Sequence, residues 1–228
     1  MKKSDLIVLI VVLVIVLIFA TIPQAGHIYQ QLNAGHGMWM SFIKFAVLAT
    51  FGESLALRLR TGHYNKPGFG LLPKAVVWGI IGLTIKMAFV IFPTGTPAFL
   101  EYLGLEGASA SLQKPLSPLA FITAFFISTA MNIIYAPVMM TFHSITDTHI
   151  AQQGGSLKAL ITPIPFRTII PALDWDNLWN FVFKKTIPLF WIPAHTITFL
   201  LPAQHQVLFA AMLSIALGVI LSLAQARK

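Results

Sequence analysis

The chain contains no cysteine and very little charge. Its 228 residues include no Cys, and Asp, Glu, Lys and Arg together make up 10% of them. The absence of cysteine excludes disulfides, thiolate metal sites and a cysteine nucleophile. Soluble domains carry about 25% charged residues. Because 57% of this chain is hydrophobic, the composition predicts an integral membrane protein.

Acidic residues are the scarcer of the two charged classes. There are 7 Asp and Glu residues against 15 Lys and Arg residues, which gives a net charge of +8. The basic residues do not form one stripe, which argues against nucleic-acid binding. They lie at the ends of apolar segments, where they set the topology and contact anionic lipid headgroups. We therefore expect membrane lipid as a partner, including anionic headgroups on the cytoplasmic side, and no nucleic acid.

Six apolar segments have the length and composition of membrane-crossing helices. The first resembles a signal peptide, but no Ala-x-Ala cleavage site follows it, so we interpret it as an uncleaved anchor. The predicted fold is all-α: one transmembrane domain over residues 1–228, formed by a bundle of six transmembrane helices with short interfacial helices. The predicted spans are about 5–22, 38–57, 75–92, 118–140, 186–201 and 206–223.

The basic residues also predict the orientation of the bundle. Cytoplasmic loops of membrane proteins carry an excess of Lys and Arg. If the N-terminus is cytoplasmic, the C-terminus is too, and most basic residues lie on the cytoplasmic side. We expect the cell inner (plasma) membrane as the location. The residues placed on the cytoplasmic side are Lys2, Lys3, Arg58, Arg60, Lys66, Lys74, Lys158, Arg167, Lys184, Lys185, Arg227 and Lys228.

The segments between the spans are predicted to be loops and short interfacial helices. Residues 23–37 are expected to form a polar loop, and the prolines of 93–97 are expected to stop the third span. Residues 98–105 are too short to cross and are assigned to the interface. The longest connection is predicted over 141–185, with a capped interfacial helix at 174–185.

Lys44 and Lys86 are candidates for lining a solute path, because a charge within a membrane helix is costly and seldom accidental. Lys86 follows Gly79 and Gly82 on one narrow arc of its helix, and small residues allow close packing of a second helix. Lys44 is predicted at a similar depth, so the two cations would form an anion-attracting vestibule. The alternatives are a Lys86 that reaches the outer interface and a Glu101 that neutralises one of the cations.

Three further polar residues are candidates for the same path. Glu53 is predicted to be a gate or a proton-linked carboxylate, or else an ion-pair partner of Arg58, Arg60 or Lys74. Asn132 and His195 lie near the middle of their helices. Each either lines the path, with His195 as a proton relay, or bonds to a neighbouring helix.

Helix packing is predicted at small residues of two helices. Gly79 and Gly82 mark the third span, and Ser214, Gly218 and Ser222 recur at four-residue spacing on the last.

No motif in the sequence indicates an enzyme, a cofactor or a metal. No pair of His residues has i, i+4 spacing, and neither a Glu-x-x-His nor a phosphate-binding loop is present. His143, Asp147 and His149 lie together in the predicted long connection. They are interpreted either as a solvated turn or as weak metal ligands. We therefore expect no cofactor, no metal site and no catalytic residue.

The order of these features resembles a known family. Its early motifs are a Gly-Asp on a helix, a basic turn, a Gly-rich helix and a Pro-Gly turn. Here the corresponding places are Gly52-Glu53, Arg58–Lys66, Gly79–Gly82 and Pro93-Thr-Gly95. Its C-terminal hairpin carries Trp-Pro, Asn-Phe and Val-Pro followed by a basic residue, and the matching run here is Trp191-Ile-Pro193, Thr198-Phe199 and Leu201-Pro202.

On these motifs the chain resembles a bacterial-type relative of the small peroxisomal and mitochondrial inner-membrane proteins whose founding member is linked to mitochondrial DNA depletion. The departures are Glu53 for the aspartate, Thr198 for the asparagine and the missing basic residue after Pro202. The resemblance implies a pore-like membrane protein for small solutes.

The expected function is therefore a passive channel or pore-like transporter for small solutes or ions. The lining candidates are Lys44, Glu53, Lys86, Asn132 and His195. The alternative is a non-conducting accessory or assembly subunit of a larger membrane complex, docked through the first helix and the aromatic segment 175–183. A homo-oligomer or a membrane-complex partner is compatible with either interpretation.

Overall fold

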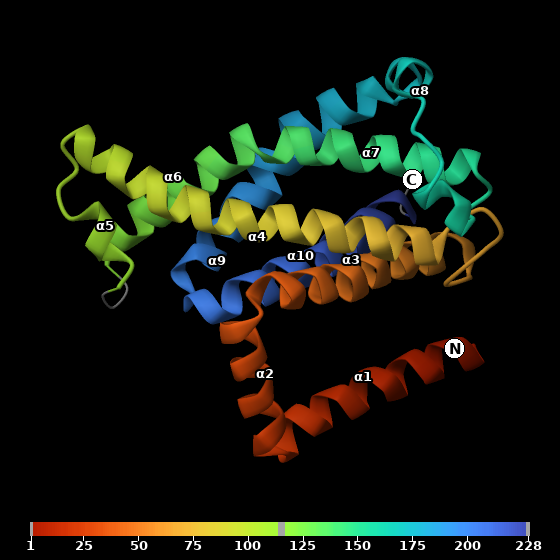
Figure 1. The fold of residues 1–228 in the computed structure, drawn as a ribbon, viewed down its shortest axis with the longest axis horizontal. Coiled ribbons are helices and arrows are strands. Elements are labelled where there is room, and N and C mark those ends of the chain that lie inside the picture. The colour runs from red at the N-terminus through yellow and green to blue at the C-terminus, as the bar shows by residue number, and fades with distance from the viewer. Residues whose placement is uncertain (1, 114–116, 227–228) are drawn as a thin grey trace. The chain divides into compact units, whose positions relative to one another are not determined.

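Helices account for the whole secondary structure of residues 2–113 and 117–226, the part of the chain that the computed structural model describes, and no strand occurs there. The all-α class is thus confirmed (Figure 1). The elements are α1 (Lys3–Thr21), α2 (Pro23–Gly35), α3 (Gly37–Thr61), α4 (Leu71–Tyr102), α5 (Ala108–Ser111), α6 (Pro118–Ile134), α7 (Ala136–Gln152), η1 (Leu157–Leu160), α8 (Phe166–Ala172), η2 (Asn177–Trp191), α9 (Ile192–Leu200) and α10 (Ala203–Ala226).

The chain divides into two units, one up to Met40 and one from Ser41 onward. The first unit contains α1, none of whose described residues is buried, and α2. The prediction of a polar loop over residues 23–37 is wrong, because most of this segment is α2. Pro23 occupies the first turn of that helix, where its fixed φ favours a helix and its missing N–H costs nothing.

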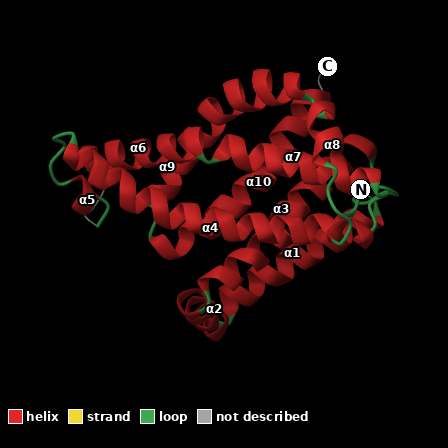
Figure 2. Ribbon diagram, turned by 45° about the horizontal axis from the view of Figure 1, so that its top comes forward, coloured by secondary structure: helices red, strands yellow, loops and turns green. Residues whose placement is uncertain are grey.

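The second unit holds the hydrophobic core. Helix α6 packs against both α4 and α9, and α7 also contacts α4. Helices α3 and α4 run antiparallel and close together, with the hydroxyl of Ser41 donating to the carbonyl of Gly82 at 2.6 Å. Figure 2 shows the same set of packed helices from another direction. The side chains of Phe45, Ile127 and Phe199 lie at the centre and are at most 2% exposed.

Within the described residues, four helices are long and apolar enough to cross a membrane: α1, α3, α4 and α10. The number is five if α6 and α7, which are bent by 42° at their junction, count as one broken span. The chain therefore has the helices of a multi-pass membrane protein. The predicted span over 186–201 is not among them, because it is divided between η2 and α9.

Two proline residues lie inside α4 without ending it. The predicted stop at 93–97 and the separate interfacial segment at 98–105 are both wrong, because α4 continues to Tyr102. A proline removes one backbone hydrogen bond, but apolar surroundings offer no water to replace the remaining ones, so the helix persists. Gly104 follows the end of the helix, and its φ of 96° is in the left-handed region that favours glycine.

The fourth predicted span, 118–140, is two helices. Helix α6 ends at Ile134, and α7 begins at Ala136 with Pro137 in its first turn. The long connection predicted to start at 141 is also wrong, since α7 continues to Gln152. Gly154 and Gly155, both with positive φ, follow its end. The polar residues of 141–149 suggest a loop in the sequence, but they form helical turns that face other helices.

Residues 177–191 form η2, a π-helix with one more residue in each hydrogen-bonded turn than an α-helix. The carboxylate of Asp174 accepts the backbone N–H of Asn177 at 2.9 Å and so caps the helical residues 175–176 that lead into η2. A capped helix is predicted here, but the helix does not end at Lys185. It continues through Pro188 and runs directly into α9, which has Pro193 in its first turn.

Candidate functional site

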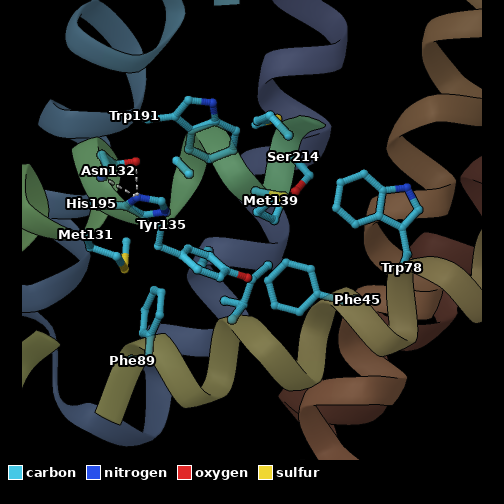
Figure 3. A pocket seen from close by; sticks show the side chains of 14 residues that line it. Phe45, Trp78, Phe89, Met131, Asn132, Tyr135, Met139, Trp191, His195 and Ser214 are labelled. Carbon is cyan, nitrogen blue, oxygen red and sulfur yellow. Dashed lines mark hydrogen bonds between the residues drawn. The ribbon is translucent and has the colours of Figure 1, made fainter. Parts of the chain in front are cut away.

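A cavity of about 40 Å³ lies inside the second unit, between α3, α4, α6, α7, η2, α9 and α10. This volume holds at least one water molecule, since one water needs roughly 10–15 Å³ by the same measure. In Figure 3, Asn132, His195 and Trp191 lie at one side of the cavity, and Phe45 and Trp78 lie at the other. The lining residues are Phe45, Trp78, Ile85, Phe89, Met131, Asn132, Tyr135, Ala136, Met139, Met140, Trp191, His195, Ala210 and Ser214.

The imidazole of His195 is the most polar group at this cavity. Its Nδ1 lies 3.0 Å from the amide nitrogen of Asn132, which also donates to the carbonyl of Ser128 at 2.9 Å. The same Nδ1 lies 3.3 Å from the amide oxygen of Asn132, so the Asn132 side chain can pair with either tautomer of the imidazole. The Nε2 atom has no hydrogen-bond partner among the described residues, so it is free to bond to a molecule in the cavity.

Aromatic rings hold the His195 side chain in place. The indole of Trp191 stacks on it with ring centres 5.1 Å apart, and the ring of Phe89 meets it edge-on at 5.9 Å. Sequence reasoning places Asn132 and His195 inside the bundle, with a bond to another helix as one alternative for each. In the structure they bond to each other across α6 and α9 and also line the cavity.

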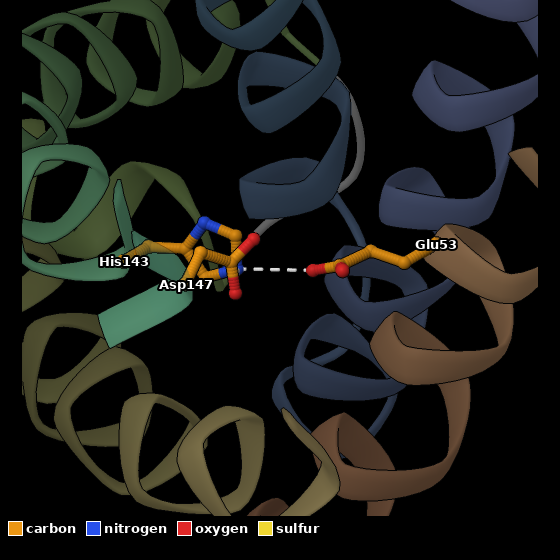
Figure 4. Close-up of side chains that lie close together, drawn as sticks. All are labelled: Glu53, His143 and Asp147. Atoms are coloured by element: carbon orange, nitrogen blue, oxygen red, sulfur yellow. Dashed lines mark hydrogen bonds and ion pairs between the residues drawn. The ribbon is translucent and has the colours of Figure 1, made fainter. Parts of the chain in front are cut away.

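A second polar group of four residues, here called the charge cluster, joins α3, α4 and α7. It consists of Glu53, Lys74, His143 and Asp147. The ammonium of Lys74 lies 2.7 Å from the Glu53 carboxylate and 2.6 Å from that of Asp147. The Nε2 atom of His143 lies 3.0 Å from Glu53 and 3.7 Å from Asp147. Figure 4 shows the Glu53 side chain extending from α3 toward both residues of α7.

Trp78 connects the charge cluster with the cavity. Its indole N–H donates to Glu53 at 2.6 Å, and its ring packs on the imidazole of His143 with centres 4.4 Å apart. Glu53 therefore accepts hydrogen bonds from Trp78, His143 and Lys74. This set of donors stabilises the ionised carboxylate in a largely apolar environment. Since Trp78 also lines the cavity, one side chain touches both polar groups.

The structure decides between the alternatives for Glu53 and corrects the interpretation of its neighbours. Of the three cations considered, Lys74 is the one that pairs with Glu53. The solvated turn suggested for His143, Asp147 and His149 is wrong, because all three lie on α7. The i, i+4 spacing of His143 and Asp147 is the signal in the sequence, since it puts both side chains on one face of a helix.

Three residues of the charge cluster have the chemistry of metal ligands. The ligand atoms of Glu53, His143 and Asp147 lie within 4.8 Å of one another. Imidazole and carboxylate groups bind several divalent transition metals. In the structure, however, the ammonium of Lys74 contacts both carboxylates and takes the place of a cation. The three residues fit a metal only when Lys74 is withdrawn.

Lys44 and Lys86 lie apart from the cavity lining and from each other. Lys44 is 7% exposed on α3, and Lys86 is half-buried on α4. The contact of Ser41 with Gly82 sets the register of these antiparallel helices. In this register Lys44 lies level with a residue of α4 that is six or seven positions before Lys86. The two lysines are therefore roughly 10 Å apart along the helix axis. They therefore do not form the shared vestibule that the sequence suggested.

The small residues predicted for helix packing lie at close helix crossings. A Cβ atom on Gly79 would lie 2.5 Å from the ring of Phe42, and one on Gly82 would lie 2.8 Å from the carbonyl of Ser41. Gly218 of α10 similarly faces the backbone of Gly52 in α3. The hydroxyl of Ser222 donates to the carbonyl of Ala56 in α3 at 3.4 Å. The carbonyl of Ser214 would lie 3.2 Å from a Cβ atom on Gly52, and Ser214 also lines the cavity.

Comparison of the chain with models of protein families, with curated proteins and with solved structures found no match in any of the three.

Proposed function

We propose that this protein is a multi-pass protein of the cell inner membrane that passes a small solute passively through its helical bundle. The observation that supports this most strongly is the position of Trp78, which lines the central cavity and bonds to the charge cluster. Polar groups within the bilayer are costly, so they are rare there and usually serve helix packing or transport. Here polar groups lie beside an internal cavity, which favours transport over packing alone.

The length of the cavity along α4 is compatible with its being the middle section of a path across the membrane. Trp78 and Phe89 both line it and are eleven residues apart on α4, or about 16 Å along the helix. This is about half of the roughly 30 Å hydrocarbon core of a bilayer. The proposed path therefore runs from the charge cluster past Trp78 and through the cavity to His195.

The lining favours a small solute with few polar groups. Most of the lining side chains are aromatic, aliphatic or methionine. Asn132, Tyr135, Ser214 and His195 supply polar atoms, and so does the indole N–H of Trp191, which is buried without a hydrogen-bond partner in the described part of the chain. A few placed polar groups in an apolar pocket are typical of sites for small molecules. The charges of Glu53 and Asp147 are paired with Lys74, so they present less field to an ion than free carboxylates would.

The proposal includes six crossings with both termini in the cytoplasm. The fifth crossing would be η2 and α9 together, which form an uninterrupted helical segment from Asn177 to Leu200. At helical rise such a segment extends about 30 Å, enough for the hydrocarbon core. The resemblance at Gly52-Glu53 and Trp191-Ile-Pro193 to a family of pore-like membrane proteins agrees with this proposal.

Solute flux through liposomes tests the function. Purified protein would be reconstituted, and the release of graded uncharged polyols and small ions would be followed by light scattering and by electrodes. We expect release above that of empty vesicles and a severalfold decrease in Ser214→Phe, which adds a ring to the cavity wall. Leu189→Phe is the matched control, because Leu189 is 77% exposed. Folded wild-type protein that releases no solute would refute the proposal.

One observation favours the alternative of a non-conducting subunit. None of the described residues of α1 is buried, so this helix has its whole apolar surface available to lipid or to another protein. Native mass spectrometry of the protein extracted in mild detergent distinguishes the two functions. A second protein present in fixed stoichiometry, together with no flux in liposomes, would support the accessory role.

A further inference from the structure

A second pocket lies next to the central cavity, and one side chain belongs to both. This pocket has a volume of about 630 Å³ and is lined by Ser109, Gln113, Gln206 and the Leu201-Pro202 turn. In the proposed orientation it opens on the extracellular side. Phe89 lines the second pocket and the central cavity alike, and Phe199 lines the second pocket beside it.

The two phenylalanine side chains close the space between these voids. Phe89 comes from α4 and is 7% exposed, and Phe199 comes from α9 and is 2% exposed. Their ring centres are 5.0 Å apart with an angle of 40° between the planes. The edge-on contact of Phe89 with His195 on the cavity side completes the wall.

We propose that Phe89 and Phe199 form the selectivity barrier of this protein, and that displacement of Phe89 opens the central cavity to the second pocket. This inference rests on the proposed function. Hydrophobic constrictions of this kind stop ions and water by excluding a hydrated path. The barrier would therefore pass uncharged solutes that can shed their water and would hold back ions.

The backbone of α4 identifies Phe89 as the side chain that moves. Pro93 has no N–H, so the helical hydrogen bond that the carbonyl of Phe89 would accept is missing. Pro97 removes a second such bond one turn later. The turn that carries Phe89 is thus held less firmly than the rest of α4. Phe199 lies instead in α9, whose single proline, Pro193, is in its first turn.

The absence of native cysteine allows a direct test. Ser214→Cys places one thiol in the central cavity, and Ser109→Cys places one in the second pocket. Each protein would be reconstituted in liposomes and treated with a charged, membrane-impermeant methanethiosulfonate. We expect rapid modification at position 109 and slow modification at 214. Adding Phe89→Ala should raise the rate at 214 by about tenfold or more.

Two variants control for loosened packing. Phe45→Ala removes a ring that lines the cavity but not the second pocket, so it should leave the rate at position 214 nearly unchanged. Phe89→Leu keeps an apolar side chain and should give an intermediate rate. Thermal unfolding of every variant identifies those that fail to fold.

The outcomes separate this inference from the proposed function. An unchanged rate at position 214 in folded Phe89→Ala and Phe199→Ala, with solute flux in the wild type, overturns the barrier and leaves the function standing. A raised rate in both variants without any wild-type flux supports the barrier and refutes passive conduction. Equal rises in Phe45→Ala and Phe89→Ala would also overturn the barrier.

Discussion

Trp78 donates its indole N–H to a carboxylate oxygen of Glu53 over 2.6 Å. The same ring forms part of the wall of the central cavity. This contact links α3 to α4 and places a half-buried carboxylate directly behind an aromatic wall. Trp78 therefore connects the charge cluster to the cavity, so a change in the ion pairs of the cluster can alter the packing of the cavity wall.

Replacement of Trp78 by Phe is expected to destabilise the fold. The substitution keeps an aromatic ring but removes the hydrogen bond to Glu53, and a bond to a charged group contributes about 1.5–3 kcal/mol. Denaturant unfolding in detergent would measure the loss. Trp179→Phe is the control, because Trp179 is 56% exposed. An equal effect in both variants would contradict the role of the Glu53 bond.

Replacement of Lys74 by Met should destabilise the protein more strongly. Glu53 and Asp147 would then face each other without the ammonium that contacts both. Breaking a fully buried ion pair costs about 3–5 kcal/mol, and the loss here should be somewhat smaller because both carboxylates are half-buried. The change would also leave Glu53, His143 and Asp147 available to a metal. We expect Mn²⁺ or Zn²⁺ to raise the melting temperature of Lys74→Met and not that of the wild type.

A double variant makes the metal result specific. Lys74→Met combined with His143→Gln lacks the imidazole ligand and should lose the metal-dependent rise in melting temperature. A rise of equal size in the wild type would show that Lys74 does not hold the cation position. A rise that persists in the double variant would place the metal elsewhere on the chain.

Two glycines of α4 give a matched test of helix packing. A Cβ atom on Gly82 would lie 2.8 Å from Phe45 and from the carbonyl of Ser41, whereas nothing lies within 4 Å of one on Gly95. Gly82→Ala must push α3 away and should cost about 1–3 kcal/mol. Gly95→Ala should be neutral or slightly stabilising, because Ala is the better helix former. Melting temperatures of both variants would check this.

The number of crossings can be counted with single cysteines. With η2 and α9 as one crossing, Asp176→Cys and Gln204→Cys should react with an impermeant reagent from opposite sides of the membrane. The thiol at position 176 should be cytoplasmic and the one at 204 extracellular. Reaction of both from the same side would show that η2 and α9 together do not cross, which reduces the count to five or fewer.

The helical class and most of the membrane segments follow from the sequence because long apolar runs leave few alternatives. The ends of those segments do not. Proline usually stops a helix in water, which explains the wrong end at Pro93, and the polar run around His143 has the composition of a loop. The first fails because α4 tolerates the loss of the hydrogen bond at Pro93, and the second fails because His143 faces Glu53 of α3 and Trp78 of α4.

The candidate site shows a similar division. A polar residue in an apolar helix is predicted to face inward, and Glu53, Asn132 and His195 are found inside. Their partners depend on helix register, which a single sequence does not contain. The pair Asn132–His195 spans 63 positions of the chain, and Asp147 lies 73 positions from Lys74. The misjudged depth of Lys44 relative to Lys86 has the same origin.

Helix α4 carries Trp78 at one end of the central cavity and Phe89 at the other. Eleven residues are just over three full turns, so both rings project from the same side of the helix. A small rotation of α4 about its own axis would displace Trp78 and Phe89 together. A bend of α4 at Pro93 would displace Phe89 and leave the bond between Trp78 and Glu53 intact. Pro93 therefore allows the Phe89 end of the cavity to open while the Trp78 end stays closed.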